Sequence, residues 1–246
     1  MNGATALTIA RKDVTVALRR RSTLVGLVVF PVIVAAGLPL VLRRVGSRGT
    51  GAVIAELAPR LVDAFAFFLV VGAAVLPTAI AAYSLVGEKV ERSLEPLLAT
   101  PASELEILLG KTLAALVPTV LALWVGAAVF VLNANHQTRT LWGRAYLPDP
   151  SFWIIVALVV PLAALFSVLA SVLVSVRATD VRTAQQLAGL MVIPFGAIYV
   201  LAEVGVFELT PAALLWIAGG LIALDAVLFL AARAVFDREE ILTRWS

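Results

Sequence analysis

Long apolar runs alternate with short charged segments along the whole chain. A helix rises about 1.5 Å per residue and the hydrocarbon layer of a bilayer is about 30 Å thick, so roughly 20 apolar residues can cross it. Six such runs cover approximately residues 23–42, 62–86, 112–132, 152–176, 187–201 and 212–232. The pattern therefore predicts an all-α integral membrane protein, with residues 1–246 forming a single transmembrane domain of six transmembrane helices.

Composition narrows the classes of function. The mean hydropathy is +1.02, and only 14% of the residues are charged. The chain has no cysteine, which excludes disulfides, thiol catalysis and cysteine metal sites, and its single histidine, His136, makes a metal site unexpected. The basic residues border apolar runs, so they indicate membrane topology and no nucleic acid partner is expected. The first apolar run is long for a signal peptide, and we expect it to be retained.

The distribution of basic residues predicts the orientation. With the N-terminus inside, thirteen Lys and Arg residues fall in the inner segments and six in the outer ones. Inner loops of membrane proteins carry the excess of positive charge. We therefore expect a multi-pass protein of the cell (plasma) membrane with cytoplasmic N- and C-termini.

Residues 4–21 precede the first apolar run and show helical periodicity. Leu7, Ala10, Val14 and either Ala17 or Leu18 share one face, and basic residues lie off it. This pattern is typical of an interfacial amphipathic helix that contacts membrane lipids. A frayed polar tail is the alternative.

Residues 87–111 form a dense charged block between the second and third apolar runs. Eight charges within 25 residues are too costly to place inside a bilayer, so the block must lie in water. Ser103 suits the start of a helix, because its hydroxyl can satisfy free backbone N–H groups. Leu105, Leu108 and Leu109 then recur at helical spacing. The segment is suited to contact a soluble partner.

The same block resembles the cytoplasmic loop of ABC-2 type permeases, the membrane subunits of ATP-driven exporters. The resemblance is carried by GEKVERSLE at residues 87–95, LLATP at 97–101 and EILLGK at 106–111. Arg92 stands where many members of the family have glycine. The resemblance implies a cytoplasmic coupling helix between spans two and three. It implies two copies of an ABC ATPase subunit as partners and a second permease, in a homodimer. The ATPase-coupling positions would be Glu88, Lys89, Glu91, Ser93, Glu95, Ser103, Glu106, Gly110 and Lys111.

The chain itself lacks a phosphate-binding loop. Gly110, Lys111 and Thr112 match the end of that motif, but Leu105 stands where the motif needs its first glycine. We therefore expect a transport subunit without catalytic residues or cofactors of its own. ATP and Mg²⁺ would bind to the partner ATPase.

Two polar features lie inside the predicted spans. Asp225 falls near the middle of the sixth, where an acid is costly and usually functional. It is either a proton or cation relay or an acid paired with a neighbouring helix. Ser167, Ser171 and Ser175 share one face of the fourth, either for close helix packing or as a polar stripe along a substrate path. The alternative function is a stand-alone secondary transporter with Asp225 as its ion-coupling site.

Overall fold

A computed structural model describes residues 3–46, 51–82, 102–142, 149–177 and 181–235. Within these ranges the chain is helical almost throughout and contains no strand, so the predicted all-α class is confirmed. The helices are α1 (Gly3–Arg19), α2 (Arg21–Gly46), α3 (Gly51–Ala82), α6 (Glu104–Trp142), α7 (Pro150–Ile154), the π-helical turn η2 (Ile155–Val159), α8 (Val160–Arg177), α9 (Val181–Gly189), α10 (Val192–Glu203) and α11 (Pro211–Val235).

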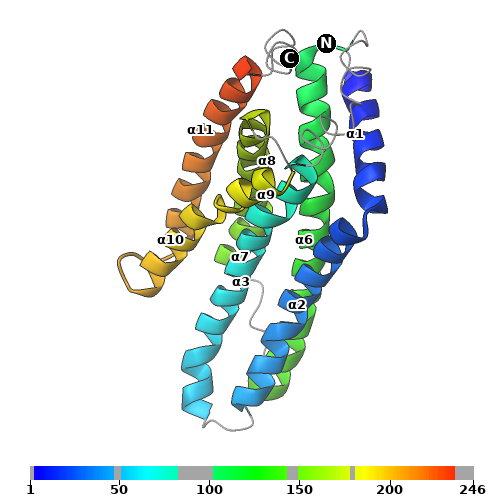
Figure 1. The fold of residues 1–246 in the computed structure, drawn as a ribbon. Coiled ribbons are helices and arrows are strands. Elements are labelled where there is room, and N and C mark those ends of the chain that lie inside the picture. The colour runs from blue at the N-terminus through cyan, green and yellow to red at the C-terminus, as the bar shows by residue number, and fades with distance from the viewer. Residues whose placement is uncertain (1–2, 47–50, 83–101, 143–148, 178–180, 236–246) are drawn as a thin grey trace.

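Two helices, α6 and α8, organise the bundle. The main partners of α6 are α1 and α2, and those of α8 are α3 and α11; α3 also packs on α6 (Figure 1). The first residues of α1, the first residues of α6 and the last residues of α11 lie at the top of Figure 1, whereas the last residues of α2 and the first residues of α3 lie at the bottom. The main core cluster runs between α2, α3, α6 and the α7–α8 segment.

Helices α2 and α6 approach closely at a glycine. A Cβ atom added to Gly126 would lie 2.6 Å from Cβ of Pro31. Real Cβ atoms do not come that near, so only glycine fits at this crossing. Small residues at such contacts are typical of helix packing in membranes, where the backbones gain dispersion energy by close approach.

Helix α6 is longer than a bilayer is thick. Its 39 residues give a length of about 58 Å, against a hydrocarbon layer of about 30 Å. Residues 104–111, which we predicted to lie in the coupling loop, form about the first two turns of this helix. Residues 133–142, which we assigned to an outer loop, continue it. The hydropathy of the sequence marks where a helix would leave the bilayer, and it does not mark where the helix ends.

The described residues contain four helices long and apolar enough to cross a membrane: Glu104–Arg139, Pro150–Ser175, Arg182–Ala202 and Pro211–Val235. The number rises to five if the pair Gly3–Arg19 and Arg21–Gly37, which is bent by 83°, counts as one span. Ala66–Ala82 is a shorter apolar helix. The chain is therefore a multi-pass membrane protein, and the count of six spans stays a prediction.

The fifth predicted span lies within the candidate membrane span Arg182–Ala202, which a short turn interrupts. We expected one helix over residues 187–201, but α9 ends at Gly189 and α10 begins at Val192. The backbone N–H of Ile193 donates to the carbonyl of Leu190 at 3.0 Å, which closes a turn between the two helices. Pro194 follows in the first turn of α10, a position where its missing N–H costs nothing.

A π-helical turn interrupts the helix between α7 and α8, shortly before Pro161. In this turn the N–H of Val160 donates to the carbonyl of Ile155, five residues back. The next bond of the same register would reach the carbonyl of Val156 from residue 161, but proline has no N–H. The indole Nε1–H of Trp124 on α6 donates to that carbonyl instead, at 2.9 Å. The interruption therefore ties α6 to the α7–α8 helix.

Candidate functional site

The predicted coupling segment divides between described and undescribed residues. Glu88, Lys89, Glu91, Ser93 and Glu95 lie outside the residues that the structure describes. The other four predicted positions are gathered at the beginning of α6 and against α1. We call this region the α1–α6 junction and define it by Asp13 and the four residues Ser103, Glu106, Gly110 and Lys111.

A reciprocal pair of hydrogen bonds fixes the first turn of α6. The backbone N–H of Glu106 donates to the hydroxyl of Ser103 at 3.3 Å. The backbone N–H of Ser103 donates to Oε2 of Glu106 at 3.0 Å. This is a capping box, which satisfies N–H groups that the helix cannot bond internally. The helix start that we predicted at Ser103 is confirmed, since α6 begins at Glu104.

Gly110 lets α1 lie directly on α6. A Cβ atom at this position would lie 2.8 Å from the carbonyl oxygen of Ala6 and 2.9 Å from Cβ of Ile9. Ile9 also belongs to a buried cluster with Ile107 and Leu108 of α6. The absence of a side chain at Gly110 therefore brings the backbone of one helix against that of the other.

A buried ion pair joins the two helices next to this contact. Nζ of Lys111 lies 3.4 Å from Oδ2 of Asp13, and their side chains are only 2% and 7% exposed. Lys12, which is mostly exposed, lies 3.7 Å from the other oxygen of Asp13. Charges this buried are tolerated only when they are paired. The pair therefore fixes the rotation of α1 on α6.

The face of α1 that is buried against the protein overlaps only partly with the apolar face that we predicted to contact lipid. Ala6, Ile9, Ala10, Asp13 and Ala17 are buried, whereas Leu7 is 66% exposed. Ala10 belongs to both faces, and the close approach at α6 favours such small residues. The contact of the apolar face with lipid stays a prediction. Sequence reasoning missed Asp13 altogether. A signal was present: Asp13 repeats the spacing of Ile9, Ala10 and Ala17, so it falls on the same helical face.

The three serines of α8 are fully buried, and Ser167 and Ser171 bond to backbone carbonyls. Ser167 donates its hydroxyl hydrogen bond to the carbonyl of Ala74 on α3. Ser171 donates to the carbonyl of Ser167 at 2.6 Å. The bond to Ala74 joins α8 to α3. Ser167 therefore contributes to the packing of α8 on α3, whereas the bond of Ser171 stays within α8.

Asp225 is buried on α11 and lies on the stripe that faces the bundle. The residue is 4% exposed, in register with Leu214, Ala218, Leu221 and Ala232. Among the described residues, neither carboxylate oxygen has a hydrogen-bond partner. Helix α11 packs mainly on α8. An acid in this state is expensive to bury, which distinguishes it from the hydrogen-bonded Ser167 and Ser171 of α8.

Candidate metal ligands are not gathered anywhere in the described part of the chain. No group of three or more His, Cys, Asp and Glu residues there could hold a metal ion. Two other features stand out: the close contact of two helices at the α1–α6 junction, and the buried carboxylate of Asp225.

Comparison with protein families finds a match over most of the chain. The model described as ABC-2 family transporter protein matches residues 7–214. A search of curated proteins finds no match. The family match covers α1 from residue 7 onward, the α1–α6 junction and all of α6 to α10.

Proposed function

We propose that this chain, which belongs to the ABC-2 family of transporter proteins, is the membrane-spanning subunit of an ATP-driven exporter. A permease role in transport follows from the family and the apolar helices. The finer proposal is that six spans form the substrate path in the plasma membrane, with both termini cytoplasmic. Two copies of a separate ABC ATPase would bind and hydrolyse ATP with Mg²⁺, and a second permease would complete a homodimer.

The observation that carries the coupling proposal is the α1–α6 junction. The end of α6 that follows the charged loop is clamped to α1 by Gly110 and by the pair of Asp13 and Lys111. From there α6 runs unbroken to Trp142. A push from an ATPase on residues 87–103 would therefore move α1 and α6 together, and α6 would carry the motion across the membrane.

Charge placement supports the same proposal. The loop contains Glu88, Glu91 and Glu95, which precede the start of α6 in the sequence. Acids on a water-facing loop are suited to basic sites on a soluble partner, because complementary charge fixes the register of an interface. Ser103 and Glu106 bond to each other in the capping box, so we propose that they fix the structure of the junction and do not bind the ATPase directly.

The test is coupled ATP hydrolysis by the assembled complex. The tagged chain is purified from its native membrane, an ATPase subunit with a phosphate loop is identified among the bound proteins, and the complex is reconstituted in liposomes. Charge reversal by Glu88→Lys and Glu95→Lys is expected to weaken assembly and reduce substrate-stimulated hydrolysis. Glu56→Lys, on α3, is the charge-matched control. Intact assembly and intact coupled turnover in the double reversal would show that this loop does not bind the ATPase.

Asp225 supports a second candidate, a stand-alone carrier driven by an ion gradient. Its burial without a hydrogen-bond partner among the described residues is what such a coupling site would show. The two candidates differ in their energy source. A carrier moves cargo in liposomes that hold a proton or sodium gradient and no ATPase, and Asp225→Asn abolishes that movement. An exporter subunit moves nothing until the ATPase and ATP are present.

A further inference from the structure

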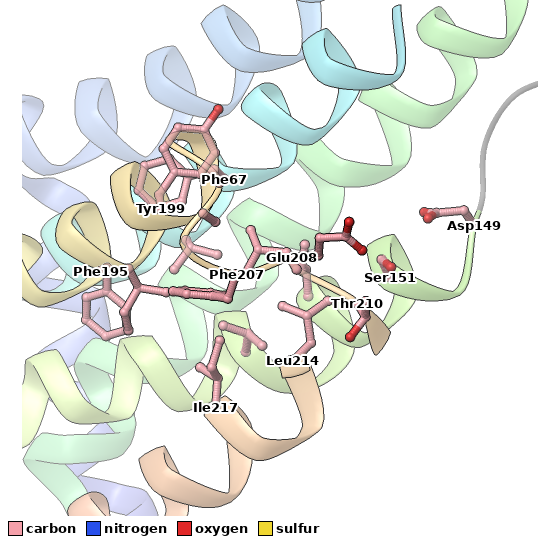
Figure 2. A pocket seen from close by; sticks show the side chains of 17 residues that line it. Phe67, Asp149, Ser151, Phe195, Tyr199, Phe207, Glu208, Thr210, Leu214 and Ile217 are labelled. Atoms are coloured by element: carbon pink, nitrogen blue, oxygen red, sulfur yellow. The ribbon is translucent and has the colours of Figure 1, made fainter. Parts of the chain in front are cut away.

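A cavity lies beside the turn between α10 and α11, away from the α1–α6 junction (Figure 1). It is open to the surface, is lined by α3, the α7–η2 segment, α10, α11 and the turn between α10 and α11, and has a volume of about 540 Å³ (Figure 2). Small-molecule sites in proteins span roughly 300–1,000 Å³. The cavity is therefore large enough for a small organic molecule.

Local structure builds the mouth of this cavity. The turn after α10 closes through Gly205, whose φ of +80° is left-handed. The N–H of Gly205 donates to the carbonyl of Ala202, and that of Val206 to the carbonyl of Leu201, both at 3.0 Å. This is a Schellman motif, and its left-handed position favours glycine. The chain then reverses toward α11.

Two helix caps complete the same rim. Thr210 caps α11, because its hydroxyl accepts the N–H of Ala213 at 3.2 Å. Asp149 caps α7, because its Oδ1 accepts the N–H of Phe152 at 2.9 Å. Caps hold the side chains that make them in one position. The polar rim is therefore fixed before any ligand arrives.

The cavity has an acidic side and an aromatic side. Figure 2 shows the carboxylates of Asp149 and Glu208 together on one side, and the rings of Phe195 and Tyr199 on the other. The ring of Tyr199 stacks on Phe67, with 4.0 Å between the ring centroids. None of the described residues that line the cavity is basic. The described lining therefore combines two carboxylates with aromatic rings, and it contains no basic side chain to balance the negative charge.

The geometry points to a binding site for a lipophilic organic cation, such as an ammonium or phosphonium ion that carries an aromatic body. Asp149 and Glu208 would attract the charge, and the rings would contact the apolar body and stabilise the cation through their π-faces. The same carboxylates would repel an organic anion and weaken its binding. The inference that such cations are the transported cargo rests on the proposed transport function. The inference that the cavity binds them does not.

A matched pair of ions tests the binding. Tetraphenylphosphonium and tetraphenylborate have nearly the same size and shape and opposite charge. Equilibrium dialysis with each radiolabelled ion measures binding to the chain in nanodiscs, with empty nanodiscs subtracted for partition into lipid. We expect saturable binding of tetraphenylphosphonium and at least tenfold weaker binding of tetraphenylborate. Equal binding of the two ions, or no saturable binding of the cation, would overturn the inference.

Variants locate the site. Glu208→Gln removes one charge, and Asp149→Asn removes the other while keeping an oxygen that can cap α7. Each is expected to weaken cation binding by about three- to tenfold, as for one partly exposed charge near a cation. Glu104→Gln, at the far end of the bundle, removes the same charge and should leave the affinity unchanged. Thermal unfolding of each variant checks the fold. Losses below about twofold in both cavity variants would contradict the site.

A transport arm separates this inference from the proposed function. If the ATPase-bound complex hydrolyses ATP but the cation neither stimulates hydrolysis nor moves, the cation is not the cargo, and the exporter proposal stands. If the cation binds and no ATPase assembles with the chain, the site stands and the exporter proposal is wrong.

Discussion

Asp13 on α1 and Lys111 on α6 form an ion pair across 98 residues of sequence. Their charged atoms are 3.4 Å apart, and both side chains are almost closed to solvent. The pair lies next to Gly110, where the backbones of the two helices meet. The contact at Gly110 sets how closely α1 and α6 approach, and the ion pair sets how α1 is rotated on α6. In the proposed mechanism, this makes α1 and the first turns of α6 move as one body.

The ion pair yields the first prediction. Asp13→Asn removes the carboxylate that Lys111 contacts, and Lys111→Met leaves Asp13 only the more exposed Lys12 at 3.7 Å. Breaking a buried ion pair costs about 3–5 kcal/mol in other proteins. We expect each variant to lower the free energy of unfolding by about 3 kcal/mol. The double variant should lose clearly less than the sum of the two, because it strands no charge. Reversible unfolding in mixed micelles, followed by circular dichroism, measures the four values. Additive losses would show that the two residues do not interact.

Gly110 yields the second prediction. In Gly110→Ala the new methyl group would lie within 3 Å of Ala6 and Ile9, so α1 must move away from α6. We expect a loss of about 1–3 kcal/mol, the usual range for overpacking, and a fall in ATPase-coupled turnover. Gly196→Ala, inside α10, is the matched control, because nothing lies within 4 Å of its new atom. There alanine should stabilise the helix slightly. Equal effects at the two glycines would contradict the close contact at Gly110.

Much of this junction could be predicted from the sequence, but its partner residues could not. Ser103, Glu106, Gly110 and Lys111 stand in one local motif, and the helix start at Ser103 follows from local chemistry. Asp13 is distant in sequence, and a single chain without aligned relatives gives no measure of which distant residues meet. Only the packing of α1 on α6 brings it to Lys111.

The end of α6 was predicted less well, and the face of α1 that packs on the protein was not predicted. Hydropathy reports where apolar side chains stop, yet α6 continues through Asn133 to Trp142 because nothing in that stretch breaks a helix. For α1 the pattern indicated an apolar face for lipid, and nothing local indicated that close packing on α6 would bury Ala6 and Ala17 together with Asp13. Tertiary contacts decide which residues of α1 are buried in the protein, and local pattern does not.

Asp225 yields the third prediction. A polar group buried without a partner destabilises the fold, so Asp225→Leu, which removes it, should raise the free energy of unfolding by about 1–3 kcal/mol. If Asp225 takes part in transport, the same variant should lose transport activity, since functional sites often trade stability for activity. Thermal unfolding and a liposome transport assay measure the two effects. A Leu variant that loses stability would show that Asp225 has a partner in the assembled protein.

Trp124 yields the last prediction. Its indole N–H takes the place of the hydrogen bond that Pro161 cannot give to the carbonyl of Val156. Trp124→Phe keeps an aromatic ring but leaves that carbonyl unsatisfied, and we expect a loss of about 1–3 kcal/mol in the free energy of unfolding. Trp216→Phe is the control, because Trp216 is 84% exposed. In a Pro161→Ala background residue 161 has an N–H again, so Trp124→Phe should cost much less there. If the loss is the same in both backgrounds, Trp124 stabilises the protein through its packing alone, and the π-helical turn is not held by the indole.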